Sequence, residues 1–379
     1  MDIGFSEEQE LLRDTARKFL DAACTTKFVR ERMATLEAVT PEFWSQIAEQ
    51  GWLGINFSED DGGIGLGLTD LVVLMEEMGR AVMPGPYFAT ALLGGAAIRE
   101  AGLPTQRQEY LPRIAAGNLR TTLAAIEPNA RWDASGITMN GQPMRGGFSL
   151  SGSKLFVPDA HLADIIVVAA RTRDGSKMED GVSLFLVPKD AAGLSVALMP
   201  SIDETRKLCE VRFDNVAVPQ TALVGEMHEG WLALARVYDG AAVALSAEMC
   251  GGAQRVLEMT VEYAKLRETF GKPIGSYQGV KHKCADMLVE VENAKSLTYY
   301  AAWAVDENRA DAPLAVSMAK SYASDASRKV SNAGIQLHGG IGMTWEHDLH
   351  LYMKRAKASE VAFGDATWHR ERVASLLGA

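Results

Sequence analysis

The pattern of apolar and polar positions divides the chain into three segments. Up to residue 118, apolar side chains recur at the spacing of a helix. Residues 119–224 contain short β-rich runs separated by glycine, aspartate, asparagine and proline turns. From residue 225 the helical spacing returns and continues to the end. We therefore predict an α+β protein with a helical domain over 1–118, an antiparallel β domain over 119–224 and a helical bundle over 225–379.

Several helix boundaries can be predicted from capping residues. Ser6 followed by Gln9 is typical of a capping box at the start of the first helix. Leu71 to Arg80 is a further strong helix, and Asp365 stands where it would cap the last one. The predicted helices of the C-terminal segment are Gly230–Leu266, Tyr277–Glu307, Ala312–Leu337 and Asp365–Leu377.

A glycine-rich stretch, Glu59–Gly67, contains a GxGxG pattern. This pattern binds a dinucleotide when a strand precedes it and a helix follows in a βαβ unit. The sequence around this stretch is helical on both sides, so we predict a loop between helices.

Composition narrows the class of protein. The 379 residues are 47% hydrophobic and carry a net charge of −11, which argues against a general nucleic-acid or anionic-membrane surface. The N-terminus is polar, and no uncharged apolar run approaches the roughly 20 residues that span a bilayer. We expect a cytoplasmic protein without a membrane segment. The four cysteines form no CxxC pair, and the histidines show no metal-binding spacing, so we expect reduced thiols and no metal.

Two segments near the end of the chain carry the most specific chemistry. Arg267–Gln278 and Gln336–Glu346 each combine glycines with long polar side chains. Glycine lets the backbone approach a diphosphate closely, and arginine can bind a phosphate through two parallel hydrogen bonds. In this order, after a β domain, they resemble the FAD-binding segments of the acyl-CoA dehydrogenase family. The resemblance covers essentially the whole chain and implies an N-terminal helical domain, a central β domain and a C-terminal four-helix bundle.

The resemblance also implies roles for particular residues. Side chains at the positions of the first segment and backbone at those of the second would contact the FAD of a partner subunit. In the β domain, Glu127 matches a position at the domain entrance, and Phe156 would cover a flavin face. The expected cofactor-binding residues are Glu127, Phe156, Arg267, Phe270, Gln278, Gln336, Gly339 and Gly340.

Three hydroxyl donors that the family uses for its own flavin are replaced here. Ile126 and Pro158 stand where the family usually has threonine, and Trp132 stands where it has serine. Each lost hydrogen bond is worth roughly 0.5–1.5 kcal/mol. Without compensation from backbone N–H groups, three losses would weaken binding by roughly two orders of magnitude.

The family's reaction requires a carboxylate base, and both usual positions lack one. They align with Phe363 and Ala241. Glu248 lies on the same helical face as Ala241, in an apolar run where burial raises the pKa of a carboxyl group. We select Glu248 as the candidate base; the alternative is a core glutamate paired with an arginine. Asp365 is better suited to N-capping, and Asp239 to a structural role.

These observations favour FAD-dependent α,β-dehydrogenation of an acyl-CoA thioester, with electrons passing to an electron-transferring flavoprotein. The retained partner-facing residues and the missing base suggest one subunit of an α2β2 assembly with a paralogue. A non-catalytic assembly subunit and a flavin monooxygenase or oxidase on the same fold are the alternatives. The small residues over 240–247, with Gly251 and Gly252, would either leave room for a bulky acyl group or allow close helix packing.

Overall fold

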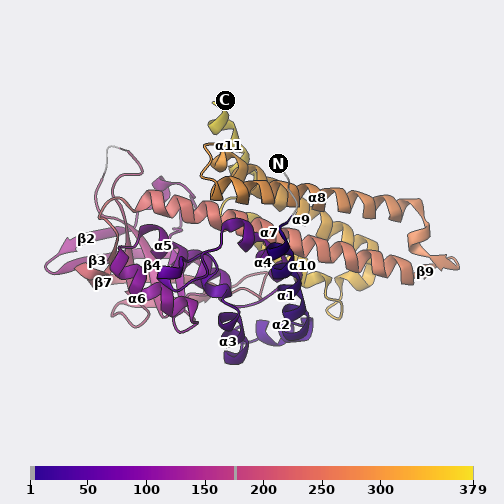
Figure 1. Ribbon diagram of the computed structural model, residues 1–379, viewed down its shortest axis with the longest axis horizontal. Helices are drawn as coiled ribbons and strands as arrows, with labels where there is room; N and C mark the ends of the chain where they lie inside the picture. Colours follow the sequence, from indigo (N-terminus) through magenta and orange to yellow (C-terminus); the bar gives the residue numbers. More distant parts are fainter. Residues whose placement is uncertain (1–4, 175–176, 379) are drawn as a thin grey trace. The chain divides into compact units, whose positions relative to one another are not determined.

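The computed structural model describes residues 5–174 and 177–378 and divides into two units. The first contains Met1–Arg32, Gly67–Met83 and Ala242–Ala379, and the second contains Met33–Leu66 and Pro84–Ala241. Each unit therefore combines parts of the chain that are distant in sequence, as the colours of Figure 1 show. The domain boundaries at residues 118 and 224 stay predictions.

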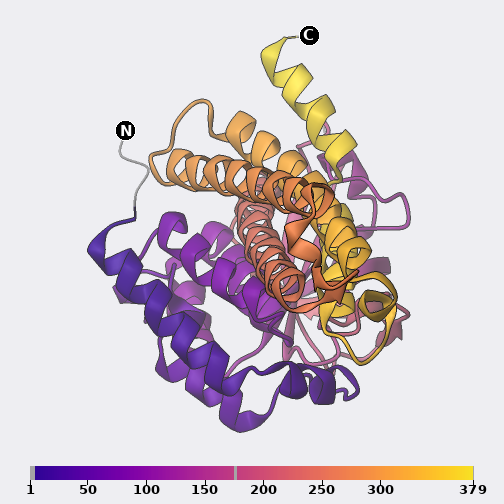
Figure 2. The same ribbon diagram turned by 90° about the vertical axis from the view of Figure 1, so that its right-hand side faces the viewer.

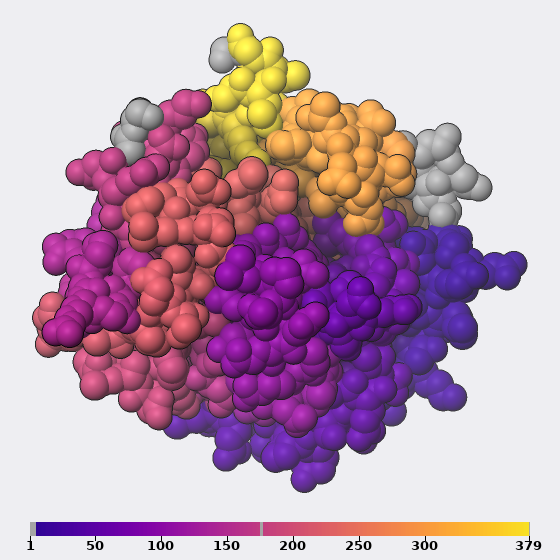
Figure 3. Space-filling view, turned by 60° about the vertical axis from the view of Figure 1, so that its left-hand side comes forward, coloured from indigo at the N-terminus to yellow at the C-terminus, as the bar shows by residue number. Residues whose placement is uncertain are grey.

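The first unit is helical, and α8 and α9 lie side by side in it (Figure 2). Both predicted caps are confirmed: Ser6 forms a capping box with Gln9, and the Asp365 side chain accepts a hydrogen bond from the Trp368 N–H. The last turns of α11 stand out from the surface (Figure 3). The helices are α1 (Glu7–Ala23), α2 (Thr26–Met33), α4 (Leu68–Arg80), α7 (Gly230–Leu266, which begins in the second unit), α8 (Gln278–Asp306), α9 (Ala312–His338), α10 (Leu349–Val361) and α11 (Ala366–Leu377).

Helices α4 and α7 pack with their backbones in contact. A Cβ atom at Gly251 would overlap the carbonyl oxygen of Glu76, and one at Gly79 would overlap that of Glu248. Only glycine fits at such an approach. Close helix packing therefore explains Gly251, and the space beside it is not free for an acyl group.

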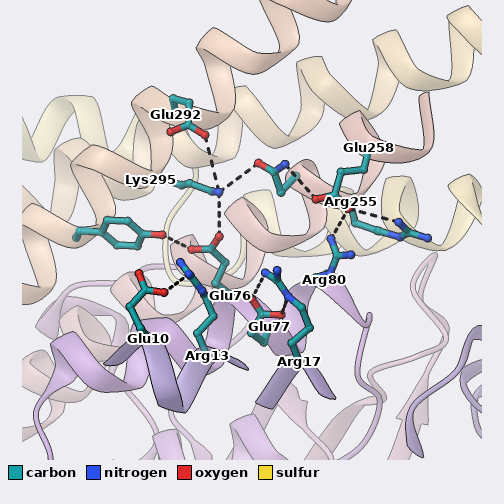
Figure 4. Close-up of polar contacts among 12 residues, drawn as sticks. Glu10, Arg13, Arg17, Glu76, Glu77, Arg80, Arg255, Glu258, Glu292 and Lys295 are labelled. Atoms are coloured by element: carbon teal, nitrogen blue, oxygen red, sulfur yellow. Dashed lines mark hydrogen bonds and ion pairs between the residues drawn. The ribbon is translucent and has the colours of Figure 1, made fainter. Parts of the chain in front are cut away.

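A network of charged side chains joins α1, α4, α7 and α8 of this unit (Figure 4). Glu76 on α4 pairs with Lys295 on α8 at 3.0 Å and accepts a hydrogen bond from the Tyr299 hydroxyl. The neighbouring Glu77 receives two hydrogen bonds, of 2.6 and 2.9 Å, from Arg17 on α1. Because both glutamates are buried, their charges require these partners.

The first turn of α4 is capped from a distant helix. Asp306, the last residue of α8, accepts hydrogen bonds from the backbone N–H groups of Leu68 (2.7 Å) and Thr69 (2.8 Å). The first N–H groups of a helix have no partner within it, so this carboxylate satisfies two of them.

The second unit is built on an eight-stranded sheet in the order β6-β7-β3-β2-β4-β5-β8, with β1 beside β4. The predicted antiparallel pairing holds except that β1 and β2 each pair with β4 in parallel. The strands are β1 (Thr121–Ala124), β2 (Asn140–Met144), β3 (Gly147–Pro158), β4 (Ile165–Arg171), β5 (Val182–Pro188), β6 (Leu194–Met199), β7 (Leu208–Pro219) and β8 (Leu223–Val224). The helices are α3 (Pro41–Glu49), the π-helix η3 (Phe88–Gly95), α5 (Ala96–Ala101) and α6 (Pro104–Ala115).

The core of the second unit lies on one face of this sheet. Phe148 on β3 and Phe185 on β5 meet there, with ring centroids 4.9 Å apart. Strand β3 alternates buried and more exposed residues, as a strand with one covered face does. The burial of this face fixes the register of β3, and with it the position of the segment around Phe156.

Candidate functional site

The segment that begins at Arg267 forms a short hairpin at the end of α7. Strands β9 (Glu268–Thr269) and β10 (Lys272–Pro273) are joined by Phe270 and Gly271, whose φ angles are +51° and +76°. Two left-handed residues are typical of the turns that close tight hairpins, but phenylalanine is uncommon in that conformation. The Phe270 side chain is 94% exposed. The hairpin therefore presents an aromatic ring to the outside at a cost in backbone strain.

The second predicted segment begins in the last turn of α9 and continues beyond its C-terminus. Gly339 ends the helix with φ +63° and begins the 3-10 turn η7 (Gly339–Met343). A Cβ atom at Gly339 or Gly340 would meet no other atom within 4 Å. The backbone of these two glycines is therefore open to a ligand.

One aromatic stack brings the two segments together. The ring of Tyr263, in the last turns of α7, stacks on that of His338 at 4.3 Å between centroids and an angle of 21°. The Arg267 N–H donates to the Tyr263 carbonyl, and His338 directly precedes Gly339. Segments about seventy positions apart in sequence thus lie at the same end of the first unit.

The long polar side chains of both segments are exposed. Over residues 5–174 and 177–378, the structure gives the side chains of Arg267, Gln278 and Gln336 no hydrogen bond and no ion pair. A guanidinium and two amides next to open glycine backbone form a suitable set of donors for phosphate oxygens.

In the second unit, Glu127 forms a buried ion pair. Its Oε1 lies 2.7 Å from Lys154 Nζ and accepts hydrogen bonds from the N–H groups of Thr138 and Met139, each at 2.9 Å. The Thr138 hydroxyl donates to Oε2. Burial raises the pKa of Glu127, but Lys154 and the other donors outweigh burial and hold this pKa below its usual value. Burial lowers the pKa of Lys154 to about 8.

Through these bonds, Glu127 stabilises the loop that follows β1. Because the carboxylate already accepts hydrogen bonds from its own chain, it would act on a cofactor through the position of this loop. A direct contact between Glu127 and FAD stays a prediction.

Phe156 stands out of the sheet at an irregularity in β3. The register between β3 and β7 shifts between Lys154 and Val157, and the Leu155 N–H bonds to the Ile126 carbonyl instead. Phe156 has φ +54° and is 48% exposed. A strained, half-exposed aromatic residue is suited to packing against a planar ligand.

None of the residues at the three replaced positions offers a side-chain hydroxyl, and two of them, Ile126 and Pro158, lie at this irregularity. Ile126 is buried, and the Pro158 carbonyl accepts a hydrogen bond of 2.6 Å from the Thr122 hydroxyl. Trp132 packs edge-on against Tyr238, with ring centroids 5.6 Å apart. At all three positions, packing or backbone contacts replace the hydroxyl.

The two aligned base positions are buried and apolar. Ala241 is 1% exposed, and Phe363 is 9% exposed with φ +57°. Glu248, our candidate base, is 3% exposed and forms an ion pair with Arg355, which is 5% exposed. Arg355 also donates to the Met83 carbonyl at 3.2 Å. The pairing with Arg355 is what we expected if Glu248 is a core glutamate and not a base. Its role as a base stays a prediction.

Sequence reasoning missed Arg355 because it did not predict helix α10. The signal was present: Leu351, Tyr352, Arg355, Ala356 and Ser359 form one buried face at helical spacing. An arginine on such a face indicates a buried acidic partner elsewhere in the chain.

The glycine-rich end of the loop after α3 uses its backbone donors within the chain. The N–H groups of Gly63, Ile64, Gly65 and Leu66 all bond to carbonyls between Gly54 and Ser58. Within the described part of the chain, no group of three or more His, Cys, Asp or Glu residues could hold a metal ion. None of the described helices is long and apolar enough to cross a membrane.

Comparison with known proteins places the chain in a family. Residues 6–118, 122–216 and 228–377 match the N-terminal, middle and C-terminal domains of acyl-CoA dehydrogenases. Acyl-CoA dehydrogenase IpdE2 of Mycolicibacterium smegmatis is 31% identical over 361 residues, which cover 95% of each chain.

Two solved structures extend this comparison. The FAD complex of PigA has a TM-score of 0.92 at 27% identity, covering 100% of this chain and 99% of that one. The ChsE4-ChsE5 complex from Mycobacterium tuberculosis has a TM-score of 0.90 at 26% identity, with the same coverage. The three matched domains and the full-length likeness show that this chain belongs to the acyl-CoA dehydrogenase family of flavoprotein oxidoreductases.

Proposed function

We propose that this chain takes part in FAD-dependent α,β-dehydrogenation of an acyl-CoA thioester as one subunit of a heteromeric assembly. The observation that carries the proposal is the Tyr263–His338 stack, which holds the Arg267 hairpin and the Gly339–Gly340 backbone at one end of the first unit. The polar side chains there are exposed and without partners in the described chain, which suits a ligand held jointly with another subunit.

The residues present fit an FAD molecule. Arg267 can bind a phosphate in bidentate fashion, Gln278 and Gln336 can donate to phosphate or ribose oxygens, and the open glycines allow a close approach of the backbone. Separately, in the second unit, Phe156 offers a ring for the face of the flavin that this chain itself would hold. When bound, the flavin would supply the hydride acceptor of the dehydrogenation.

The substrate's α proton requires a base, and this chain offers a poor one. Glu248 forms an ion pair with Arg355, and the two positions where the family usually has its base carry Ala241 and Phe363. We therefore propose that a paralogous subunit supplies the carboxylate. Support comes from the likeness to the ChsE4-ChsE5 complex, which joins two differently named proteins. We further propose an electron-transferring flavoprotein as the electron acceptor, as the family resemblance implies.

A second candidate function is favoured by the Glu248–Arg355 pair. If Glu248 is only a structural partner and the cofactor contacts are unused, the chain would be a non-catalytic assembly subunit. The effect of the partner-facing residues on cofactor affinity separates the two functions.

The test compares Arg267→Met with Lys265→Met, a matched loss of one exposed charge two residues earlier. A hydrogen bond to a charged group contributes about 1.5–3 kcal/mol, so Arg267→Met should weaken FAD affinity by about ten- to a hundredfold. Lys265→Met should leave it within about threefold. Affinity is measured by FAD fluorescence on the assembly of this chain with a co-expressed paralogous subunit. An unchanged affinity in Arg267→Met would contradict cofactor contact. Full turnover by the isolated chain with stoichiometric FAD would contradict the heteromeric assembly.

A further inference from the structure

Beneath η7 lies a group of aromatic and titratable side chains from four parts of the first unit. His338 and His350 are 3% and 6% exposed, at the end of α9 and the start of α10. Tyr263 of α7 covers His338, and Arg30 of α2 reaches His350. One buried histidine, His338, directly precedes the turn that carries Gly339 and Gly340, and the other, His350, stacks on Trp345 two residues after the turn ends.

The hydrogen bonds of His338 fix its proton on one nitrogen. Its Nδ1 lies 2.8 Å from the Gly334 carbonyl, which can only accept, so Nδ1 donates. Its Nε2 is buried and has no hydrogen-bond partner among the residues that the structure describes. A second proton would have to sit on this nitrogen, without solvent or an acceptor, next to the His347 ring at 4.7 Å.

His350 is kept neutral by a different contact. Its Nε2 lies 3.2 Å from Arg30 NH2, and a guanidinium can only donate, so Nε2 accepts. Protonation of Nε2 would break this hydrogen bond and leave two cations facing each other. The ring also stacks on Trp345 at 4.6 Å.

The surrounding charges mostly oppose protonation of these rings. Arg30 is held by Asp348 at 2.8 Å, and Lys354 Nζ lies 4.7 Å from the centre of the Trp345 ring. Burial lowers the pKa of His350, and Arg30 and Lys354 lower it further. Burial and the neighbouring His347 lower the pKa of His338, against the opposing effect of its bond to Gly334.

The remaining charged neighbours are on the connecting segment itself. Burial also lowers the pKa of His347, although Asp348 raises it. Glu346, one residue earlier, is fully exposed and interacts with Arg30. The carboxylates thus offset the cations only in part, and the site as a whole favours neutral rings.

We propose that His338 and His350, with Arg30, are positioning residues for the cofactor-contact turn Gly339–Met343, and that this turn loses its hold on FAD when either ring takes up a proton. The inference rests on the proposed function, because it assumes that this turn contacts FAD. A protonated ring must leave its buried position, and the backbone of Gly339 and Gly340 moves with it.

The direction of the pH effect follows from the lowered pKa values. An opened turn exposes histidines with the ordinary pKa of 6.5, while the closed turn keeps them neutral. The closed turn is therefore fully favoured above pH 6.5 and loses stability as the pH falls below it. Each histidine contributes up to about tenfold per pH unit.

The test measures FAD affinity of the assembly that contains this chain at pH 8.0, 7.0, 6.0 and 5.5. The wild type should lose at least about tenfold between pH 7.0 and 5.5. The double variant His338→Asn and His350→Gln keeps the donor of the first ring and the acceptor of the second but cannot take up a proton. Its affinity should stay within about threefold over the same range. Arg30→Gln removes a charge that lowers the pKa of His350 in the closed turn. The closed and open pKa values then lie closer together, so the loss of affinity between pH 7.0 and 5.5 should be smaller than in the wild type.

A second measurement does not depend on FAD. Hydrogen–deuterium exchange of the FAD-free assembly, corrected for the intrinsic effect of pH, follows peptides covering residues 336–348. Their protection should fall between pH 7.5 and 5.5 in the wild type and stay constant in the double variant. Unchanged protection in the wild type overturns the inference, even if the variant fails to fold. Absence of FAD binding at pH 8.0, with protection that still falls with pH, would contradict the proposed function alone.

Discussion

The buried pair Glu248–Arg355 allows the structural and catalytic roles of Glu248 to be separated. Both side chains are almost fully buried, and each is the ionic partner of the other. The perturbation is a double-mutant cycle with Glu248→Gln, Arg355→Met and the two together.

The expected magnitudes follow from burial and from the chemistry of each partner. Removing one member of a buried pair leaves an uncompensated charge, which costs about 3–5 kcal/mol. Arginine cannot lose its proton, so Glu248→Gln should keep its full cost at every pH. Glu248 can take up a proton when Arg355 is replaced, so Arg355→Met should cost less at pH 5 than at pH 8. The double variant should be more stable than the sum of the single losses by about 2 kcal/mol or more.

The assay is urea unfolding of the purified assembly at fixed protein concentration, followed by far-UV circular dichroism, together with acyl-CoA turnover. A coupling energy below about 1 kcal/mol would refute the structural pairing. Turnover then tests catalysis: if Glu248 is only a structural partner, the double variant should regain activity along with stability. A stable double variant that remains inactive would instead identify Glu248 as the base.

Three further predictions concern stability. Gly251→Ala should lower the free energy of unfolding by at least about 1–3 kcal/mol, because its Cβ would overlap the Glu76 carbonyl. Gly252→Ala, whose Cβ would have its nearest neighbours at 3.6 and 3.8 Å, should be neutral or stabilising. The two variants are compared by their urea midpoints, and equal effects would contradict the close contact of α4 and α7. Asp306→Ala should cost about 1–2 kcal/mol through the lost cap of α4, and Asp306→Asn should restore part of it; an unchanged midpoint in Asp306→Ala would refute the cap. Burial lowers the pKa of Lys320 to about 7, so between pH 7 and 10.5 the unfolded chain binds one more proton than the folded chain at this residue. The contribution of Lys320 to the free energy of unfolding therefore rises with pH, by up to about 1.4 kcal/mol per pH unit. Lys320→Met should remove this rise from the thermal midpoint, and the same pH dependence of the midpoint in wild type and variant would contradict it.

The sequence predicted those features that depend on neighbours along the chain. The Ser6 capping box and the Asp365 cap need only a few residues, and both are confirmed. The predicted helix Gly230–Leu266 agrees with α7, because its apolar spacing continues without a breaker.

The features that could not be predicted depend on contacts between distant parts of the chain. Nothing near Glu248 in the sequence identifies Arg355 as its partner, since the two lie on different helices 107 positions apart. The parallel pairing of β1 with β4 depends on the path of the whole sheet, and local alternation carries no information about it. The choice of glycine at position 251 has a physical reason only after Glu76 is placed beside it.

Three phenylalanines with positive φ connect the fold with the proposed function. Phe156, Phe270 and Phe363 have φ angles of +54°, +51° and +57°. Phenylalanine lacks the polar side chain that lets asparagine or aspartate adopt this conformation readily, so each position stores strain of about 1–3 kcal/mol. All three stand where the resemblance noted in the sequence implies a cofactor contact or a base, and these roles stay predictions. At Phe363, the carbonyl accepts a hydrogen bond from His369, and the next carbonyl accepts one from buried Lys320, so the strained turn persists although the carboxylate is absent. The three positions thus combine a strained backbone conformation with side chains that cannot act as a base. This combination is expected if, as we propose, the chain shapes a shared active site while a partner subunit supplies the base.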